Sequence, residues 1–333
     1  MRILVAGGAG YLGCVLIPKL LQRGHDVEVV DLFWFGNSLP RHIRVINKDI
    51  FDITVRDLAV YDQVVFLAGL SNDPMADFSP SKNFIFNAAA PAYLAYISKR
   101  AGVRRYVYAS SCSIYGFTEN KLYDETCPTL AQYPYGISKL QGEQAVMQLA
   151  DREFSTIALR KGTISGYSPR MRFDLIINTM FMNAMKNGII TVNNPAIWRP
   201  ILGIADAANA YVCALEADRN ISGVFNIASV NHTVGEVADL VKTEIEQKLL
   251  TPVKLNVRNM QDGRNYKVSI DKAKALLGFE PQDDVPSIVT SLVDNIRTIR
   301  DWDNPVYYNI QTLMTLEHLH EVAVPARAMS AEA

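Results

Sequence analysis

The first thirteen residues constrain the fold of this chain more than any other feature of its sequence. The apolar run 2–6 leads directly into the letters GGAGYLG at 7–13, and a helical pattern continues to residue 22. The spacing of Gly7, Gly10 and Gly13 suits a tight turn, close approach of the backbone to a diphosphate, and close packing of a helix on a strand. Phosphate groups bind well at such a helix N-terminus. The pattern predicts a βαβ unit that binds a dinucleotide.

A second apolar run, 26–31, ends in an acidic residue, Asp31. An acid that follows the glycines by about twenty residues hydrogen-bonds the adenosine ribose of a dinucleotide and repels a 2′-phosphate. No basic residue follows Asp31 in the letters LFWF at 32–35. We therefore expect NAD rather than NADP. The alternative is a glycine-rich turn in an α/β protein that binds no nucleotide.

Short Val- and Ile-rich runs alternate with longer helical patterns through the first half of the chain, which is typical of a parallel sheet covered on both faces. Strands are expected at 2–6, 26–31, 43–47, 63–68, 104–110 and 155–160, and helices at 11–22, 81–101 and 134–150. The prediction is a Rossmann-type, doubly wound α/β fold. The second half is less regular, with helices expected near 175–187, after 234 and near 285–301.

This change in pattern predicts two domains. Residues 1–165 are expected to form the NAD-binding Rossmann domain, to which segments near 200–230 could return, and residues 166–325 to form mainly a smaller, C-terminal substrate-binding lobe. The Ala-rich tail, 326–333, is expected to be disordered.

The bulk composition excludes several classes of partner. With 33 basic and 34 acidic side chains, the chain has no long-range field that would attract nucleic acid or a membrane surface. Its four cysteines are scattered, its five histidines are not spaced as metal ligands, and no apolar stretch reaches eighteen residues. We expect a cytoplasmic protein without a metal site, a nucleic-acid partner or a membrane span.

Hydroxyl side chains follow the fifth predicted strand. Ser111 and Ser113 come directly after an apolar run and should emerge at the carboxyl end of the sheet, where ligands bind in open α/β sheets. Downstream, Tyr135 and Lys139 share one face of a predicted helix. The lysine, one turn away, would favour the phenolate form of the tyrosine. The alternative is an ordinary pair of residues on a solvated helix face.

Together, these motifs resemble the extended short-chain dehydrogenase/reductase family, and within it the NAD-dependent nucleotide-sugar epimerases and dehydratases. The resemblance rests on the glycine pattern, Asp31, the serine cluster ending in IYG at 114–116, and YGISK at 135–139, and it extends to FNIA at 225–228. It implies a nucleotide-diphosphate sugar as substrate and a homodimer formed through the helices 81–101 and 134–150.

The resemblance also implies a role for each matching residue. Ser111 would hydrogen-bond the reacting sugar oxygen, Tyr135 would act as general acid and base, and Lys139 would bind the nicotinamide ribose and lower the Tyr135 pKa. Together with residues at the ends of predicted strands, the expected cofactor contacts are Gly7, Gly10, Tyr11, Leu12, Gly13, Asp31, Asp49, Ile50, Leu67, Ala68, Gly69, Asn87, Tyr135 and Lys139. The expected substrate contacts are Ser111, Cys112, Ser113, Thr163, Arg172, Arg199 and Arg264.

Three of these contacts, the arginines, suit the substrate diphosphate. Arg199 and Arg264 match family positions that hold this group, whereas Arg172 is equally explained as a solvated loop residue. Two positions depart from the family pattern, because Thr163 replaces an asparagine and Gly203 replaces a histidine. These departures leave the identity of the sugar open.

The residues after Ser111 reduce the number of reaction types that the resemblance allows. Relatives that dehydrate sugars carry Asp-Glu there, whereas this chain has Cys112 and Ser113, neither of which is an acid of suitable strength at neutral pH. Cys112 is more simply explained as structural than as a second acid. We expect an NAD-dependent epimerase that works through a transient keto sugar. The alternatives are a keto-sugar reductase that uses NAD or NADP, a dehydratase, and a dinucleotide-binding protein without catalysis.

Overall fold

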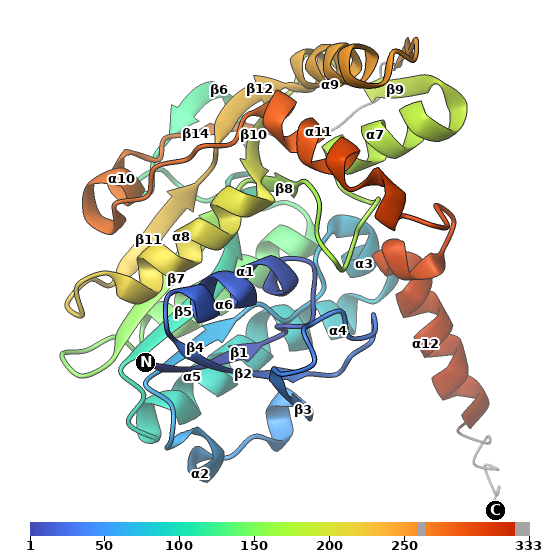
Figure 1. The fold of residues 1–333 in the computed structure, drawn as a ribbon. Helices are drawn as coiled ribbons and strands as arrows, with labels where there is room; N and C mark the ends of the chain where they lie inside the picture. Colours follow the sequence, from blue (N-terminus) through green and yellow to red (C-terminus); the bar gives the residue numbers. More distant parts are fainter. Residues whose placement is uncertain (259–263, 324–333) are drawn as a thin grey trace, which may run out of the picture.

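The computed structural model describes residues 1–258 and 264–323, so the predicted disordered tail lies outside the described residues. Its centre is a seven-stranded sheet in which every pairing is parallel (Figure 1). In spatial order the strands are β11 (Gly223–Ile227), β7 (Ser155–Lys161), β5 (Arg105–Ser111), β4 (Gln63–Phe66), β1 (Arg2–Ala6), β2 (Asp26–Asp31) and β3 (Arg44–Asn47). The doubly wound α/β prediction is confirmed.

Helices cover both faces of this sheet, because successive side chains of each buried strand point to opposite sides. On one face, Val107 and Ala109 of β5 pack in the same core as α1 (Gly13–Gln22) and α8 (Ile204–Glu216). On the other face, Tyr106 and Tyr108 pack with α5 (Ala90–Arg100) and α6 (Pro134–Met147). Ser111, in phase with Val107 and Ala109, therefore leaves the sheet on the α1–α8 side.

The helix expected at 81–101 is interrupted. It consists of α4 (Pro80–Phe84), a π-helical turn (Ile85–Ala89) and α5, with Pro91 in the first turn of α5. Proline lacks the N–H that would bond to the carbonyl four residues before it, which here is that of Asn87. The Tyr108 hydroxyl donates to this carbonyl instead, at 2.9 Å. The interruption thus follows from one proline and is stabilised by the sheet.

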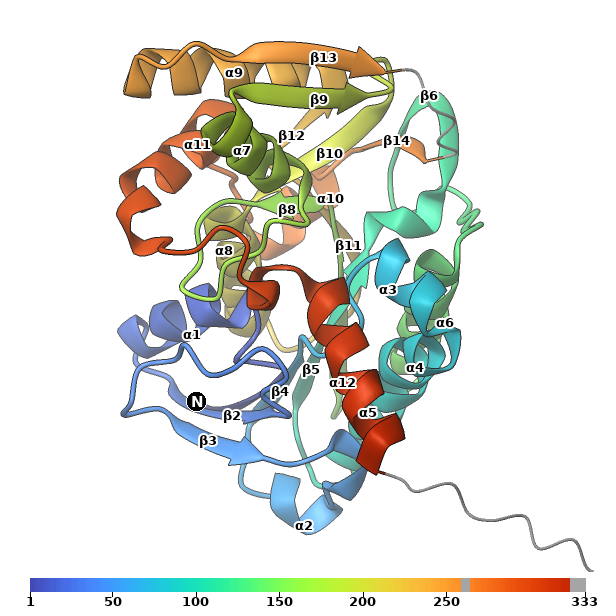
Figure 2. The ribbon, with the colours of Figure 1, turned by 90° about the vertical axis from the view of Figure 1, so that its right-hand side faces the viewer.

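A smaller lobe lies beyond the carboxyl ends of the main strands (Figures 1 and 2). Its sheets are β12-β10-β8, β13-β9 and β14-β6, made of β6 (Phe117–Tyr123), β8 (Thr163–Ser165), β9 (Ile189–Asn193), β10 (Trp198–Gly203), β12 (Val230–Thr233), β13 (Lys254–Arg258) and β14 (Asn265–Val268). Its helices are α7 (Ile176–Asn187), α9 (Val234–Leu249), α10 (Asp271–Leu277) and α11 (Val285–Asp294). Between β10 and β12 the chain returns to the main sheet as α8 and β11.

Three further α-helices of the described residues are α2 (Val55–Leu58), α3 (Asp73–Phe78) and α12 (Asn309–Ala323). Short 3-10 helices lie at Ile50–Asp52, Cys112–Tyr115, Ile296–Thr298 and Pro305–Tyr307. α12 packs against α3, and its Glu317 forms an ion pair with Lys82 of α4 at 2.5 Å; Figure 2 shows α12 crossing in front of this region. None of the described helices is both long and apolar enough to span a bilayer. Within the described residues, no group of three or more His, Cys, Asp or Glu side chains is arranged to hold a metal ion.

Candidate active site

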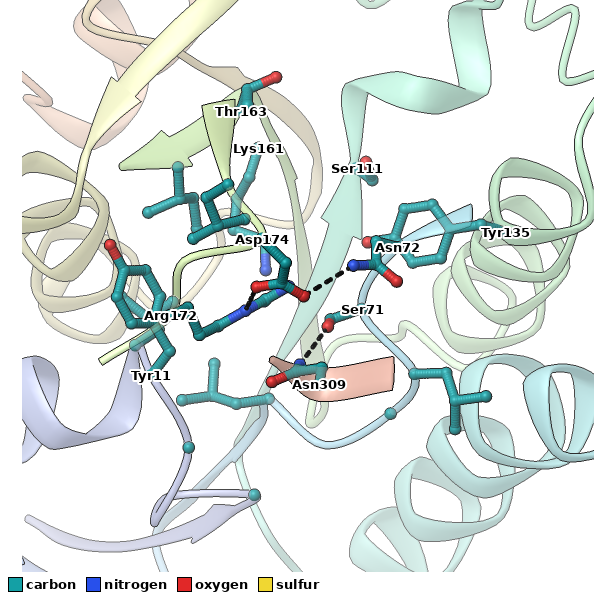
Figure 3. Close-up of a pocket in the computed structure, with 18 of the residues that line it drawn as sticks. Tyr11, Ser71, Asn72, Ser111, Tyr135, Lys161, Thr163, Arg172, Asp174 and Asn309 are labelled. Atoms are coloured by element: carbon teal, nitrogen blue, oxygen red, sulfur yellow. Dashed lines mark hydrogen bonds and ion pairs between the residues drawn. The ribbon is translucent and has the colours of Figure 1, made fainter. Parts of the chain in front are cut away.

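A pocket of about 730 Å³ lies between the sheet and the smaller lobe, a common place for ligand binding in open α/β sheets. Its floor is the turn after β1, and its walls come from the segments after β2, β4, β5 and β7. The smaller lobe contributes Thr191, Asn193, Arg199 and Arg264, and the start of α12 contributes Asn309. Figure 3 shows the part of the pocket around Tyr135 and Arg172.

The backbone of the glycine-rich turn packs closely against neighbouring backbone, as the spacing of its glycines predicts. Gly7 has a φ of +78°, and a Cβ there would lie 2.4 Å from the backbone nitrogen of Ala68. A Cβ on Gly13 would lie 2.1 Å from the carbonyl oxygen of Gly8. The turn and the start of α1 line the pocket at Gly7, Gly10, Tyr11, Leu12 and Gly13. Only glycine permits this close approach.

Asp31 lies at the carboxyl end of β2, where its carboxylate accepts hydrogen bonds from the backbone nitrogens of Ala9 (2.9 Å) and Phe33 (2.8 Å). Burial raises the pKa of Asp31, and these backbone hydrogen bonds act in the opposite direction. The side chain lines the pocket together with Asp49 and Ile50. The three residues therefore share one end of the pocket, as expected for an adenosine site.

The segment after β4 lines the same pocket through Leu67, Ala68 and Gly69, whereas Asn87 does not reach it. The Asn87 amide donates to the Leu70 carbonyl (2.9 Å) and to Asn83 Oδ1 (2.8 Å). Asn87 thus lies behind the wall and orders the loop that forms it. A direct contact of Asn87 with the cofactor, which the family resemblance implies, stays a prediction.

Ser111, Ser113 and Tyr135 meet at the opposite end of the pocket. The Ser113 hydroxyl donates to Ser111 Oγ at 2.9 Å. Burial raises the pKa of Tyr135, while the nearby Ser111 hydroxyl and the charge of Arg172 lower it. Arg172 comes from the smaller lobe, and its effect on this tyrosine was not predicted from the sequence.

Lys139 lies one layer behind the pocket rather than in its lining. Its ammonium group donates to the Ala109 carbonyl at 3.1 Å and lies 5.9 Å from the centre of the Tyr135 ring. Burial, and then the charge of Lys161, lower the pKa of Lys139. The lysine shares a helix face with Tyr135, as predicted, but in this structure its ammonium bonds to the β5 backbone.

Cys112 does not contact the pocket, which corrects the expectation that it binds substrate. Its side chain is fully buried, its Sγ donates to the Arg160 carbonyl at 3.0 Å, and burial raises the pKa of the thiol. The physical reason is that β5 ends at Ser111 and Cys112 begins the short 3-10 helix Cys112–Tyr115. There its side chain joins a small apolar cluster with Ile114 and Tyr115, behind the pocket.

The remaining substrate residues do line the pocket: Thr163, Arg172, Arg199 and Arg264. Arg172 forms an ion pair with Asp174 at 2.8 Å and is buried, so its interpretation as a solvated loop arginine is wrong. Arg264 pairs with Asp73 at 2.5 Å, across the pocket from the smaller lobe to α3. The Arg199 guanidinium donates to the carbonyls of Trp198 and Arg264.

Arg170 is a pocket residue that the sequence analysis missed. It is buried, its guanidinium lies 4.0 Å from the centre of the Phe35 ring, and it donates to Asn309 Oδ1. Its Nε is buried without a hydrogen-bond partner among the described residues. Burial lowers the pKa of Arg170 to about 9. Such a cation is suited to an anionic ligand group.

Comparison with known proteins decides the family. Residues 3–228, from β1 to the residue after β11, match the NAD dependent epimerase/dehydratase family. This chain belongs to that family. A known member of the extended nucleotide-sugar group, the UDP-glucose 4-epimerase of Corynebacterium glutamicum, is 27% identical over 305 residues, which cover 85% of this chain and 91% of that enzyme. UDP-glucuronic acid decarboxylase 1 of Danio rerio is 25% identical over 306 residues, or 84% of this chain and 69% of that protein.

Solved structures of the family agree in fold and cofactor. MoeE5 in complex with UDP-glucuronic acid and NAD has a TM-score of 0.79 at 25% identity, and the match covers 90% of this chain and 99% of that one. The UDP-glucuronic acid 4-epimerase of Bacillus cereus, in complex with the same two ligands, has a TM-score of 0.79 at 22% identity over 90% of this chain and 100% of that one. Family members are thus NAD-dependent, and they differ in reaction.

The residues of the pocket fit NAD, the cofactor of this family. Added side chains would fill the glycine turn, and Asp31 and Arg170, whose Nε is buried and unsatisfied, line the same pocket. The turn and Arg170 would hold the diphosphate of NAD, and Asp31 its adenosine ribose. The nicotinamide half then belongs toward β5 and β7, because the strand order reverses between β1 and β4.

Proposed function

We propose that this protein is an NAD-dependent epimerase that inverts C4 of a nucleotide-diphosphate sugar through a transient keto intermediate. The observation that carries the proposal is that Ser111, Ser113 and Tyr135 line the same pocket, with Ser113 hydrogen-bonded to Ser111 at 2.9 Å. No carboxyl group follows Ser111, since Cys112 points into the protein and Ser113 carries a hydroxyl. The hydroxyl groups of this wall can transfer a proton to or from a sugar oxygen, but the wall lacks the carboxylic acid that elimination of water requires.

In the proposed reaction, bound NAD supplies the redox chemistry, first as hydride acceptor and then as hydride donor. Ser111 hydrogen-bonds the C4 oxygen of the sugar. Tyr135 takes the hydroxyl proton as C4 becomes a ketone, and it returns the proton when C4 is reduced from its other face. Arg199 and Arg264 face the same pocket and would hold the diphosphate while the keto sugar turns over.

The reaction is tested by incubating the protein with a panel of nucleotide sugars and analysing the products by mass spectrometry and NMR. An isomer of unchanged mass supports the proposal. Loss of water would indicate a dehydratase, loss of carbon dioxide a decarboxylase, and gain of two hydrogens from reduced cofactor a reductase. NAD binding without turnover of any sugar would instead indicate a protein that only binds the dinucleotide.

The variant Tyr135→Phe tests the role of the hydroxyl. We expect kcat to fall about 1000-fold, in the range that loss of a general acid/base produces, while bound NAD is retained. Tyr93→Phe is a matched control, because the Tyr93 hydroxyl donates to the Ile53 carbonyl on the far side of the sheet from Ser111. Full activity in Tyr135→Phe would refute the mechanism.

A further inference from the structure

A half-buried lysine, Lys161, faces the reacting end of the pocket, and the mechanism above gives it no role. Lys161 is the last residue of β7, where it is the direct partner of Ser111 in the parallel pairing with β5. Paired residues on neighbouring strands point to the same side of a sheet, and the strands are about 4.8 Å apart. Lys161 therefore lies beside the hydroxyl that binds the reacting oxygen, and it lines the same pocket (Figure 3).

Among the described residues, no carboxylate is paired with the Lys161 ammonium. Within the described part of the chain it makes no ion pair or hydrogen bond, and the Tyr211 ring lies 6.0 Å away. The neighbouring charges, Arg172 and Lys139, are also positive. Burial, and then Arg172, lower the pKa of Lys161 to about 8.

Three other cations of the pocket are paired with carboxylates: Arg172 with Asp174, Arg264 with Asp73, and Lys48 with Asp57 at 3.0 Å. Arg170 and Arg199 instead donate hydrogen bonds to Asn309 and to backbone carbonyls. A cation enclosed by the protein without a partner is stabilised when a ligand supplies the opposite charge. The position of Lys161 thus favours a negative group close to the atom at which the substrate reacts.

We propose that Lys161 binds a carboxylate on the reacting sugar, so that the substrate is a nucleotide-diphosphate hexuronic acid. This inference rests on the proposed function, which places C4 of the sugar at Ser111 and Tyr135. In a hexuronic acid the C6 carboxylate is attached to C5, next to C4, whereas the diphosphate is attached to C1 across the ring. Only the carboxylate lies on the C4 side, where the strand pairing holds Lys161.

Thr163 is placed to complete this subsite. It lies two residues after Lys161, at the start of β8, and its side chain lines the pocket. A threonine hydroxyl can donate one hydrogen bond to a carboxylate, alongside an ammonium group with three donors. Gly162, between them, leaves no room for a side chain, since a Cβ there would lie 2.6 Å from the Pro200 carbonyl oxygen.

The test compares matched pairs of ligands, glucose and glucuronic acid linked to UDP, dTDP, GDP and CDP, by calorimetry and turnover on NAD-loaded protein. We expect at least one uronate to bind about 100-fold more tightly than its neutral partner, the scale of a buried charge pair. Lys161→Met should remove this preference and leave neutral-sugar binding within about threefold. Lys161→Arg should keep the preference to within about tenfold.

Lys254→Met, which removes one exposed charge on β13, is the matched control and should change neither affinity. If no uronate binds better than its neutral partner, or if Lys161→Met weakens both ligands equally, the proposal is refuted. The binding measurement separates this outcome from failure of the proposed function. A uronate preference that depends on Lys161, without isomerisation, would overturn the epimerase reaction and keep the carboxylate site. Isomerisation of neutral sugars alone, without a uronate preference, would support the epimerase reaction and overturn the carboxylate site.

Discussion

At the scale of single residues, the end of β5 is held by a buried charge pair. The Glu143 carboxylate on α6 accepts a hydrogen bond from the Ser110 hydroxyl at 2.6 Å. It also forms an ion pair with Arg160, whose Nε and Nη2 both donate to it, Nη2 at 2.6 Å. Arg160 also donates to the Tyr115 hydroxyl at 2.8 Å. The pair lies on the α6 side of the sheet, directly behind the strand end from which Ser111 enters the pocket. It therefore fixes the position of the reacting wall.

Replacement of Glu143 by glutamine should lower the free energy of unfolding by about 3 kcal/mol, because it leaves the buried Arg160 charge uncompensated. Urea denaturation at neutral pH measures the change. Glu153→Gln is the control, since Glu153 is exposed and lies 3.9 Å from Arg219, and it should cost less than about 0.5 kcal/mol. Equal effects of the two substitutions would show that the buried pair contributes no more than an exposed one.

At the scale of elements, α12 closes one side of the cofactor end of the pocket. Asn309, its first residue, donates to Ser71 Oγ at 2.8 Å and accepts from Arg170. One turn later, the buried Leu313 packs with Leu70 and Met75 beside Trp34 and Phe35. α12 thus joins segments that follow β2, β4 and β8, and its attachment rests on a small apolar cluster.

Because a small cluster holds α12, we expect Leu313→Ala to release this helix without unfolding the protein. A buried Leu→Ala change costs about 2 to 5 kcal/mol, and in this local unit the cost should appear as faster loss of NAD, by about tenfold or more. NAD retained after gel filtration measures the effect. Met314→Ala, at the neighbouring exposed position, should retain NAD like the unaltered protein. Equal retention by both variants would mean that α12 does not enclose the cofactor.

At the scale of the whole molecule, the two lobes are joined across the pocket. The Tyr11 hydroxyl on the glycine-rich turn donates to the Gly166 carbonyl at 2.5 Å, and Asn72 donates to Asp174 at 2.9 Å. The Arg264–Asp73 pair forms a third connection. Residues of both lobes also belong to one continuous apolar core. The cofactor end and the sugar end are therefore held in a fixed relation.

The homodimer that the family resemblance implies stays a prediction at this scale. The outer surface of the α4–α5 region exposes Ile85 (44%) and Tyr96 (50%), which suits contact with a second copy. We expect sedimentation equilibrium to give twice the chain mass of 37.1 kDa. Tyr96→Glu should shift the mass toward that of one chain, because the interface would bury an unpaired charge. A single-chain mass for the unaltered protein would contradict the prediction.

Features encoded in short segments could be predicted from the sequence. The six strands expected in the first half appear at nearly the expected bounds, because each is a short apolar run between turn residues. The glycine turn, Asp31, and the helix face shared by Tyr135 and Lys139 are also local. Their spacing along the chain sets their geometry, whatever the rest of the molecule does.

The tertiary structure alone decided which charges face the pocket and which are compensated. Lys161 lies fifty residues after Ser111, and only the pairing of β7 with β5 makes them neighbours. Asn309 meets Ser71 across 238 residues of chain. No local pattern encodes such contacts, because they depend on the order of strands in the sheet and on the path of the chain between lobes. The sequence by itself therefore determined the dinucleotide fold and the candidate residues Ser111, Tyr135 and Lys139, and the folded chain determined that Lys161 lies beside Ser111 in the pocket.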